Sequence, residues 1–213
     1  MSGLVNIVDD DASFRTAMER RLKHAGYEVA TYPSALDLLD NLPTENVPGC
    51  ILLDVRIPGL SGPELQERLS ELGSTLPIIF ISGHTDIPVT VRALKAGADD
   101  FLTKPVTSQD LFPAIQRALA RHQTSREQRT KLDVVYARIG TLTPRERQVF
   151  QLIIGGKTNK QIGILLGATE RTIKAHRQRV MVKMQVRTLA ELVSVAERAG
   201  VLGGASDSQH TAR

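Results

Sequence analysis

The sequence predicts an α/β domain built on a doubly wound, five-stranded parallel sheet, followed by a small all-α domain. Short apolar runs alternate with stretches of helical period over residues 1–120, whereas only short helical patterns follow residue 140. At 213 residues the chain exceeds the usual size of one domain. Residues 1–120 hold 10 Lys and Arg against 16 Asp and Glu, and residues 121–213 hold 17 against 7. We therefore expect an acidic domain before a basic one, and the basic domain favours a polyanionic partner.

Five apolar runs are the expected strands of the sheet. They span Leu4–Val8, Glu28–Tyr32, Cys50–Asp54, Pro77–Ser82 and Asp100–Thr103. Between the runs, apolar residues recur every three or four positions, as in Ala35, Leu38 and Leu42, and this spacing predicts helices. Gly26 and Gly73 stand where two of these helices are expected to end. Helices that connect parallel strands cover both faces of a sheet, which gives the doubly wound arrangement.

Residues 121–140 predict a helical linker between the two domains. This segment is rich in charge and contains no proline, and Leu132, Val135 and Ile139 recur at helical spacing. We expect a solvated helix packed on its neighbour rather than a coiled coil, because fewer than three heptads are visible. At the end of the chain, residues 203–213 predict a disordered tail.

Residues 141–202 predict a domain of four short helices. Thr143 provides a capping hydroxyl for the first helix, and a glycine-containing turn separates the second helix from the third. Two helices joined in this way are typical of a helix-turn-helix. The fourth helix is expected to direct Leu189 and Leu192 inward. The helices are expected over about residues 144–154, 159–166, 170–184 and 188–199.

Composition excludes several classes of protein. A single cysteine, Cys50, rules out an internal disulfide framework and an all-cysteine zinc site. The apolar runs are too short to span a bilayer and no signal peptide is visible, so we expect a cytoplasmic protein without a membrane partner. The absence of tryptophan and an aromatic content of 4% weaken any base-stacking platform for single-stranded nucleic acid.

Polar residues that follow the expected strands indicate a metal site. Ligands of an open parallel sheet bind at the carboxyl ends of its strands. The first strand is followed by Asp9 and Asp10, the third ends in Asp54, the fourth ends in Ser82, and Lys104 follows the fifth. Carboxylates that converge at one edge repel one another unless a cation neutralises them, and Mg²⁺ suits hard oxygen ligands. The next residue, Asp11, is expected only to cap the first helix.

This arrangement resembles the flavodoxin-like receiver domain of two-component response regulators over residues 1–120. The resemblance is carried by IVDDD, LLDVRIPGLSG, FISGH and LTKP. It implies that Asp54 accepts a phosphoryl group from a sensor histidine kinase, and that Lys104 and Ser82 contact the phosphoryl oxygens. It also implies a Mg²⁺ site formed by Asp10 directly, Asp9 through water, Asp54, and the backbone carbonyl of Arg56.

Further implications of the receiver resemblance concern switching and dimerisation. Phe101 matches the switch aromatic of the family, although it can equally be an ordinary core residue of the fifth strand. Together with Ser82 it would respond to phosphorylation. Val91 and Lys95 match a dimer face, for which the alternative is a helix with merely exposed residues. The bond between Lys104 and Pro105 is a candidate cis peptide.

The third helix of the second domain carries a basic face. Between positions 171 and 187 the chain holds six Lys or Arg residues and no acid. Helical geometry puts Ile173, Val180 and Met184 on one buried side. The outward side then presents five residues that suit the major groove of DNA: Arg171, Ala175 and Gln178, flanked by Lys174 and Arg179.

The second domain resembles the LuxR-type helix-turn-helix of the NarL/FixJ regulators. The resemblance is carried by LTPRERQVFQL, TNKQIGILLG and TERTIKAHRQRVMVKMQV, with Gly163 in place of the usual Ala and Gln161 in place of the usual Glu. It implies base contacts from Lys174, Ala175 and Gln178. His176 can equally be a packing residue. The residues implied to contact phosphate or orient the helix are Thr172, His176, Arg177, Asn159 and Lys160.

Together the two resemblances predict a response regulator rather than an enzyme. Phosphorylation of Asp54 is expected to promote dimerisation and sequence-specific binding to double-stranded DNA, and RNA polymerase is a further expected partner. Asp9 to Ser13 also imitates the opening motif of haloacid-dehalogenase phosphatases, but that alternative leaves LLDVRIPG and the basic domain unexplained. A third reading keeps the DNA-binding domain and makes the first domain a docking module that works without phosphorylation.

Overall fold

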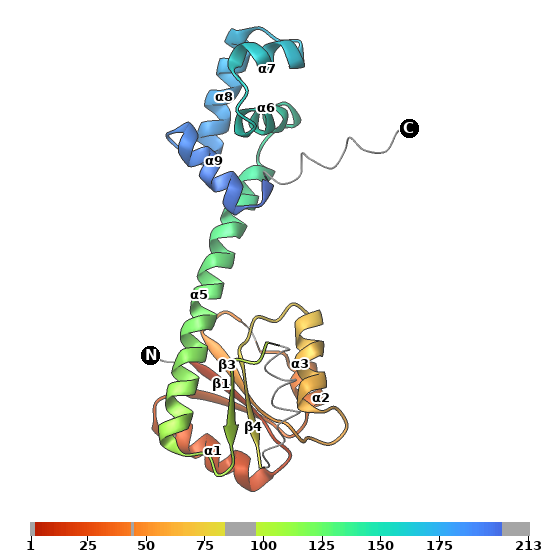
Figure 1. Ribbon diagram of the computed structural model, residues 1–213, viewed down its shortest axis with the longest axis vertical. Coiled ribbons are helices and arrows are strands. Elements are labelled where there is room, and N and C mark those ends of the chain that lie inside the picture. Colours follow the sequence, from red (N-terminus) through yellow and green to blue (C-terminus); the bar gives the residue numbers. More distant parts are fainter. Residues whose placement is uncertain (1–2, 44, 84–96, 202–213) are drawn as a thin grey trace. The chain divides into compact units, whose positions relative to one another are not determined.

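A computed structural model of the protein describes residues 3–43, 45–83 and 97–201 (Figure 1). Contacts within the chain divide it into two compact units, Met1–Glu127 and Gln128–Arg213. Each unit is described by itself below.

The first unit contains a five-stranded sheet in which all strand pairs are parallel. The order is β2-β1-β3-β4-β5. The bounds are β1 Leu4–Val8, β2 Glu28–Tyr32, β3 Gly49–Asp54, β4 Ile78–Ser82 and β5 Asp100–Thr103. The expected α/β class and the five parallel strands are confirmed, with β3 starting one residue earlier and β4 one residue later than expected.

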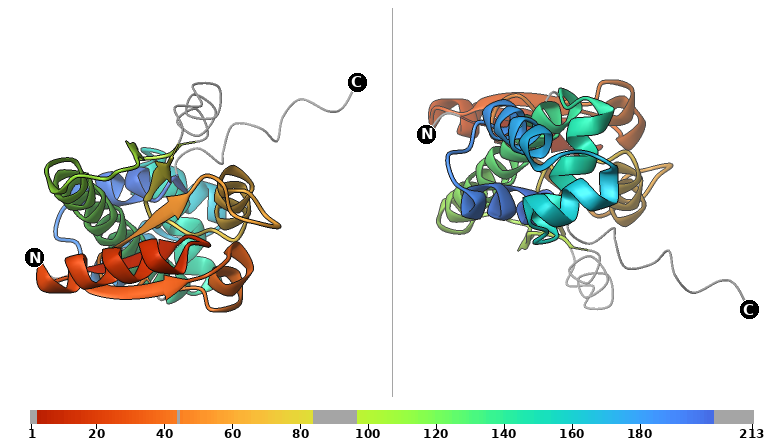
Figure 2. Two further views of the ribbon diagram at one scale, coloured as in Figure 1. Left: turned by 90° about the horizontal axis from the view of Figure 1, so that it is seen from below. Right: turned by 90° about the horizontal axis from the view of Figure 1, so that it is seen from above.

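Helices lie on both faces of this sheet. They are α1 Ala12–His24, α2 Ala35–Asp40, α3 Gly62–Glu71 and α5 Ser108–Gly140. One apolar cluster joins the sheet to α1 and α5, and a second joins its other face to α2 and α3. Figure 2 shows the helices on either side of the sheet. Strand β3 is buried along its whole length because both faces are covered.

Local sequence explains where the helices begin and end. The Asp11 side chain accepts hydrogen bonds from Ser13 N and Phe14 N, so it caps α1 as expected. Gly26 follows α1 with a φ of 88°, in the left-handed region that favours glycine. Leu42, expected in the second helix, was assigned wrongly: α2 ends at Asp40 and the Leu42 side chain is 43% exposed. The residue before a proline is disfavoured in the helical region, and Pro43 follows Leu42.

The second unit contains four further helices around one apolar core. They are α6 Pro144–Ile154, α7 Asn159–Leu166, α8 Glu170–Met184 and α9 Leu189–Arg198. Gly167, with a φ of 62°, makes the turn between α7 and α8. Leu192 is fully buried, but Leu189 is 45% exposed, so the expectation that both point inward was wrong for Leu189. Leu189 is the first residue of α9, where the helix starts at the N-cap Thr188, ahead of the buried positions.

The C-terminal part of α5 packs within the second unit. Val135 and Ile139 contact its apolar core. The Tyr136 hydroxyl donates to the carbonyl of Ala199 at 2.8 Å, and Arg138 donates to the carbonyl of Met184 at 3.2 Å. These contacts satisfy carbonyls at the ends of α9 and α8 that lack helical partners.

Some sequence expectations concern residues outside the described part of the chain. Val91 and Lys95, the expected dimer face, lie there, as does the expected tail over 203–213. In the part that the structure does describe, no helix is both long enough and apolar enough to cross a bilayer.

Candidate functional site

The register of the sheet brings the polar strand ends together at one edge. Val8 pairs with Leu53, so Asp9 and Asp54 are neighbours at the carboxyl ends of β1 and β3. On the other side, Asp54 pairs with Ile81 of β4. Ser82 pairs with Thr103 of β5, and Lys104 follows directly. The topology therefore gathers residues from four strands into one site, as their positions in the sequence predicted.

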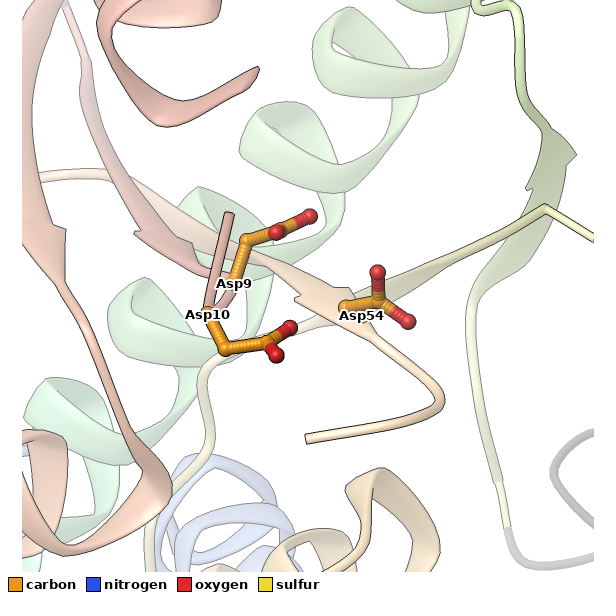
Figure 3. A group of neighbouring side chains, drawn as sticks. All are labelled: Asp9, Asp10 and Asp54. Carbon is orange, nitrogen blue, oxygen red and sulfur yellow. The ribbon is translucent and has the colours of Figure 1, made fainter. Parts of the chain in front are cut away.

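Three carboxylates form the centre of this site. One carboxylate oxygen each from Asp9, Asp10 and Asp54 lies within 4.8 Å of the other two, and Figure 3 shows the side chains extending from two adjacent strand ends. Asp9 and Asp54 are buried, whereas Asp10 is exposed. Oxygens bound to one Mg²⁺ lie about 3–4 Å apart, given a metal–oxygen distance of about 2.1 Å. The three side chains therefore fit a hard divalent cation after small rotations.

Lys104 supplies the positive charge that faces the carboxylates. Its Nζ lies 2.7 Å from Oδ2 of Asp9 and 2.5 Å from Oδ2 of Asp54. Burial alone would lower the pKa of Lys104, but the bonds to Asp54 and Asp9 outweigh it and raise the pKa above its usual value. Burial raises the pKa of Asp9, and the bonds from Lys104 and Asp11 offset this only in part. One lysine thus leaves the acidic cluster under-neutralised, which favours cation binding.

Backbone groups hold the remaining carboxylate oxygens. Asp9 Oδ1 accepts from the amide of Asp11 at 2.9 Å, and Asp54 Oδ1 accepts from the amide of Arg56 at 2.8 Å. Asp54 is therefore oriented by two contacts, one to each of its oxygens. Separately, the peptide bond between Lys104 and Pro105 is cis, as expected.

The two expected switch residues occupy different environments. Ser82 is 3% exposed at the end of β4, and its carbonyl accepts from the amide of Lys104 at 2.7 Å. Phe101 is partly buried and packs against the apolar cluster on the α2 and α3 face. Its roles as switch aromatic and as core residue both remain compatible with this position.

Sequence reasoning missed two residues of α1 that support the site. The ring centroid of Phe14 lies 4.1 Å from Lys104 Nζ, and Arg15 donates to the carbonyl of Asp9. Phe14 also packs against the cluster between the sheet and α5, so its apolar spacing gave only the signal of a core residue. Nothing in that spacing indicates a contact with a lysine 90 positions away.

Most of the expected DNA-contacting residues lie on α8, and two lie at the start of α7. Ile173, Val180 and Met184 are fully buried, which confirms the predicted inner side of this helix. Asn159 and Lys160 form the first turn of α7, the first partly buried and the second exposed. His176 and Arg177 are partly exposed. The exposed members of the expected set on α8 are Arg171, Thr172, Lys174, Ala175, Gln178 and Arg179.

An ion pair ties α8 to the start of α6 and uses one of the basic residues of α8. Lys183 Nζ lies 2.6 Å from Oε2 of Glu146, which is 3% exposed and also accepts from the amide of Thr143. The bonds from Lys183 and Thr143 lower the pKa of Glu146 to about 2. Lys183 therefore ties α8 to α6 rather than extending the exposed basic face of α8.

Both units match known domain families. The family model described as "Response regulator receiver domain" matches residues 5–116. The model described as "Bacterial regulatory proteins, luxR family" matches residues 140–196. Every residue of the acidic site falls in the first match, and α8 falls in the second.

Similar proteins extend over almost the whole chain. Nodulation protein W of Bradyrhizobium diazoefficiens is 41% identical, covering 93% of this chain and 87% of that protein. Transcriptional regulatory protein FixJ of the same organism is 40% identical, covering 94% and 97%. Among solved structures, response regulator StyR matches with a TM-score of 0.82 at 44% identity, covering 93% of this chain and 100% of that one. Full-length FixJ from B. japonicum matches with a TM-score of 0.57 at 40% identity, covering 94% and 98%.

Proposed function

Because this chain belongs to the NarL/FixJ family of two-component response regulators, which regulate transcription, we propose that Asp54 is its phosphoryl acceptor. The observation that carries this proposal is the surroundings of Asp54 at the end of β3. Its carboxylate lies 2.5 Å from the Lys104 ammonium and beside two further carboxylates suited to a cation. This position therefore combines a carboxylate nucleophile with neutralisation of the charge on a transferring phosphoryl group.

The proposed reaction is a phosphoryl transfer from a histidine of the sensor kinase. A carboxylate oxygen of Asp54 attacks phosphorus, and the bond between phosphorus and the histidine nitrogen breaks. The electron pair of that bond remains on the nitrogen, and the histidine, whose other ring nitrogen carries a proton, leaves as neutral imidazole. Lys104 and the Ser82 hydroxyl donate to phosphoryl oxygens, and the loose transition state needs positioning and charge neutralisation rather than a general base.

Receiver domains bind Mg²⁺ at an acidic pocket, and in this chain we assign that role to the cluster at the ends of β1 and β3. When bound, Mg²⁺ supplies neutralisation of the phosphoryl charge. The residues that would hold it are Asp9, Asp10, Asp54 and the backbone carbonyl of Arg56.

The proposed output is DNA binding by a dimer. A phosphorylated Asp54 carries about two negative charges, which would draw in Ser82 and shift Phe101. Dimerisation would place two copies of α8 on half-sites about one DNA turn apart. Lys174, Ala175 and Gln178 would then read base edges, and RNA polymerase would be recruited nearby, all in the cytoplasm. Arg171 and Arg179 would lie beside these three residues on the side of α8 that faces the groove. The residues that would contact phosphates or orient the helix are Thr172, His176, Arg177, Asn159 and Lys160.

Intact-mass measurement tests the assignment of Asp54. The protein is incubated with Mg²⁺ and acetyl phosphate, and the wild type is compared with Asp54→Asn. Asp11→Asn is the matched control, because Asp11 caps α1 close to the site without belonging to the cluster. We expect one labile phosphate on the wild type and on the control but none on Asp54→Asn. An unmodified wild type would favour a docking module that works without phosphorylation.

A further inference from the structure

The ammonium of Lys104 has an aromatic ring as its third contact. Nζ lies 4.1 Å from the ring centroid of Phe14, in addition to its bonds to Asp9 and Asp54. A cation within about 6 Å of a ring centroid is attracted to the negative face of the ring. Three residues therefore surround the Lys104 ammonium: Asp9, which follows β1, Asp54 of β3 and Phe14 of α1. Of these three, only Phe14 lies on a helix.

Helix α1 holds the Phe14 ring firmly. The ring packs against the apolar cluster between the sheet and α5. At the start of the helix, the Phe14 amide donates to the Asp11 side chain at 3.1 Å, and Arg15 donates to the carbonyl of Asp9. Further along the helix, Arg21 donates to the carbonyl of Val106 at 2.8 Å. The helix is thus tied both to the segment that carries Asp9 and to the segment that follows Lys104.

During phosphoryl transfer, the two carboxylate contacts of Lys104 must weaken, whereas its contact with the Phe14 ring can persist. Asp54 gives one oxygen to the new bond with phosphorus, and Asp9 belongs to the cluster that would hold a cation. Both bonds to the lysine must therefore weaken when it turns to the phosphoryl oxygens. The ring attracts the ammonium without any hydrogen bond that must break. It also covers a side chain that is only 23% exposed, which limits competition from water.

We propose that Phe14 is a positioning residue for phosphoryl transfer: its ring face holds the Lys104 ammonium while the hydrogen bonds of Lys104 pass from Asp9 and Asp54 to the phosphoryl group. This inference rests on the proposed function. Phe14 touches no reacting atom and acts only through Lys104. Its replacement therefore changes the rate of phosphorylation only as long as the lysine is present.

A double-mutant cycle on the full chain tests the inference. Phosphorylation by acetyl phosphate at saturating Mg²⁺ is followed by intact mass for Phe14→Leu, Phe14→Tyr, Lys104→Met and Phe14→Leu/Lys104→Met. An exposed cation–π contact corresponds to about twofold to fivefold in rate and a desolvated one to roughly thirtyfold. We expect Phe14→Leu to slow the reaction about fivefold to tenfold, Phe14→Tyr to retain most of the rate, and Phe14→Leu to change nothing further when Lys104 is methionine.

Two additional measurements separate positioning from general destabilisation. Phe112→Leu is the matched control, since Phe112 packs against the same apolar cluster and stacks on Tyr27. It should lower the urea midpoint comparably and leave the phosphorylation rate unchanged. In NMR spectra of lysine-labelled protein, the ε-methylene protons of Lys104 should show an upfield ring-current shift that Phe14→Tyr keeps and Phe14→Leu loses.

The possible results distinguish the inference from the function on which it rests. A wild type that is phosphorylated while Phe14→Leu reacts at the same rate overturns the role of Phe14 and leaves Asp54 as acceptor. Equal slowing by Phe112→Leu, or an undiminished effect of Phe14→Leu in the Lys104→Met protein, overturns it as well. A wild type that takes no phosphate refutes the proposed function itself.

Discussion

Replacing Gly62 with alanine is expected to disturb Asp54 through the backbone. A Cβ added at Gly62 would lie 2.8 Å from the carbonyl oxygen of Asp54, 2.8 Å from the Phe80 ring and 3.2 Å from Cα of Val55. Real Cβ contacts are essentially never shorter than 3.0 Å, so the helix start and the strand end must separate by about half an ångström. Overpacking of this kind costs about 1–3 kcal/mol.

The displacement also reaches the candidate site. Asp54 is the last residue of β3, and its bond to Lys104 is 2.5 Å long, so a movement of the strand end changes that geometry directly. We expect Gly62→Ala to lower the free energy of unfolding by about 1–3 kcal/mol and to slow phosphorylation by acetyl phosphate at least tenfold.

Urea denaturation and intact-mass kinetics measure these two effects. Gly140→Ala is the matched control, because a Cβ at Gly140 meets no atom within 4 Å in the described structure and its φ is not positive. The control should be as stable as the wild type or slightly more stable, with an unchanged rate of phosphorylation. If Gly62→Ala has the same urea midpoint and phosphorylation rate as the wild type, the inference that the close approach of α3 fixes the position of Asp54 is refuted.

The remaining predictions concern buried titratable groups and the recognition helix. Burial lowers the pKa of His122, so the unfolded chain takes up a proton at a higher pH than the folded chain does. We therefore expect stability to fall as pH drops below about 6.5. In His122→Gln, the change of the urea midpoint with pH between about pH 6.5 and 5 should be smaller. The bond from Lys183 lowers the pKa of Glu146 to about 2, so the contribution of the pair to folding stability is complete above pH 4.5 and is lost as pH falls toward 2. Lys183→Met should lower the thermal midpoint at pH 7 and flatten this acid transition in calorimetry. An unchanged midpoint would contradict a structural role for the pair. A DNA site for the recognition helix, α8, is first selected from random sequences with the wild type. In fluorescence anisotropy, Gln178→Ala should lose about tenfold to a hundredfold in affinity for that site, whereas Gln148→Ala on α6 should bind it normally. Equal binding by both variants would remove Gln178 from the base contacts.

The fold and the main members of the acidic site could be predicted because both depend on position along the chain. Strand ends of a parallel sheet meet at one edge, so Asp9, Asp54, Ser82 and Lys104 had to converge once their strands were identified. The inner side of α8 followed from helical geometry in the same way.

What the sequence did not reveal depends on contacts between distant segments. Phe14 has the spacing of a core residue, and only the packing of α1 on the sheet brings its ring to Lys104. Gly62 reads as part of an ordinary helix start, yet it has no room for a side chain beside Asp54. A similar close approach occurs at Gly163, where a Cβ would lie 2.7 Å from the carbonyl oxygen of Ala168 in the turn before α8. Such distances depend on how elements pack, which no local pattern records.

The affinity of the protein for DNA before and after phosphorylation tests the central claim most directly. Wild type and Asp54→Asn are titrated onto the selected DNA site with Mg²⁺, with and without acetyl phosphate. We expect acetyl phosphate to raise the affinity of the wild type at least tenfold and to leave Asp54→Asn unchanged. Equal affinities of the phosphorylated and unphosphorylated wild type would contradict control of DNA binding through Asp54.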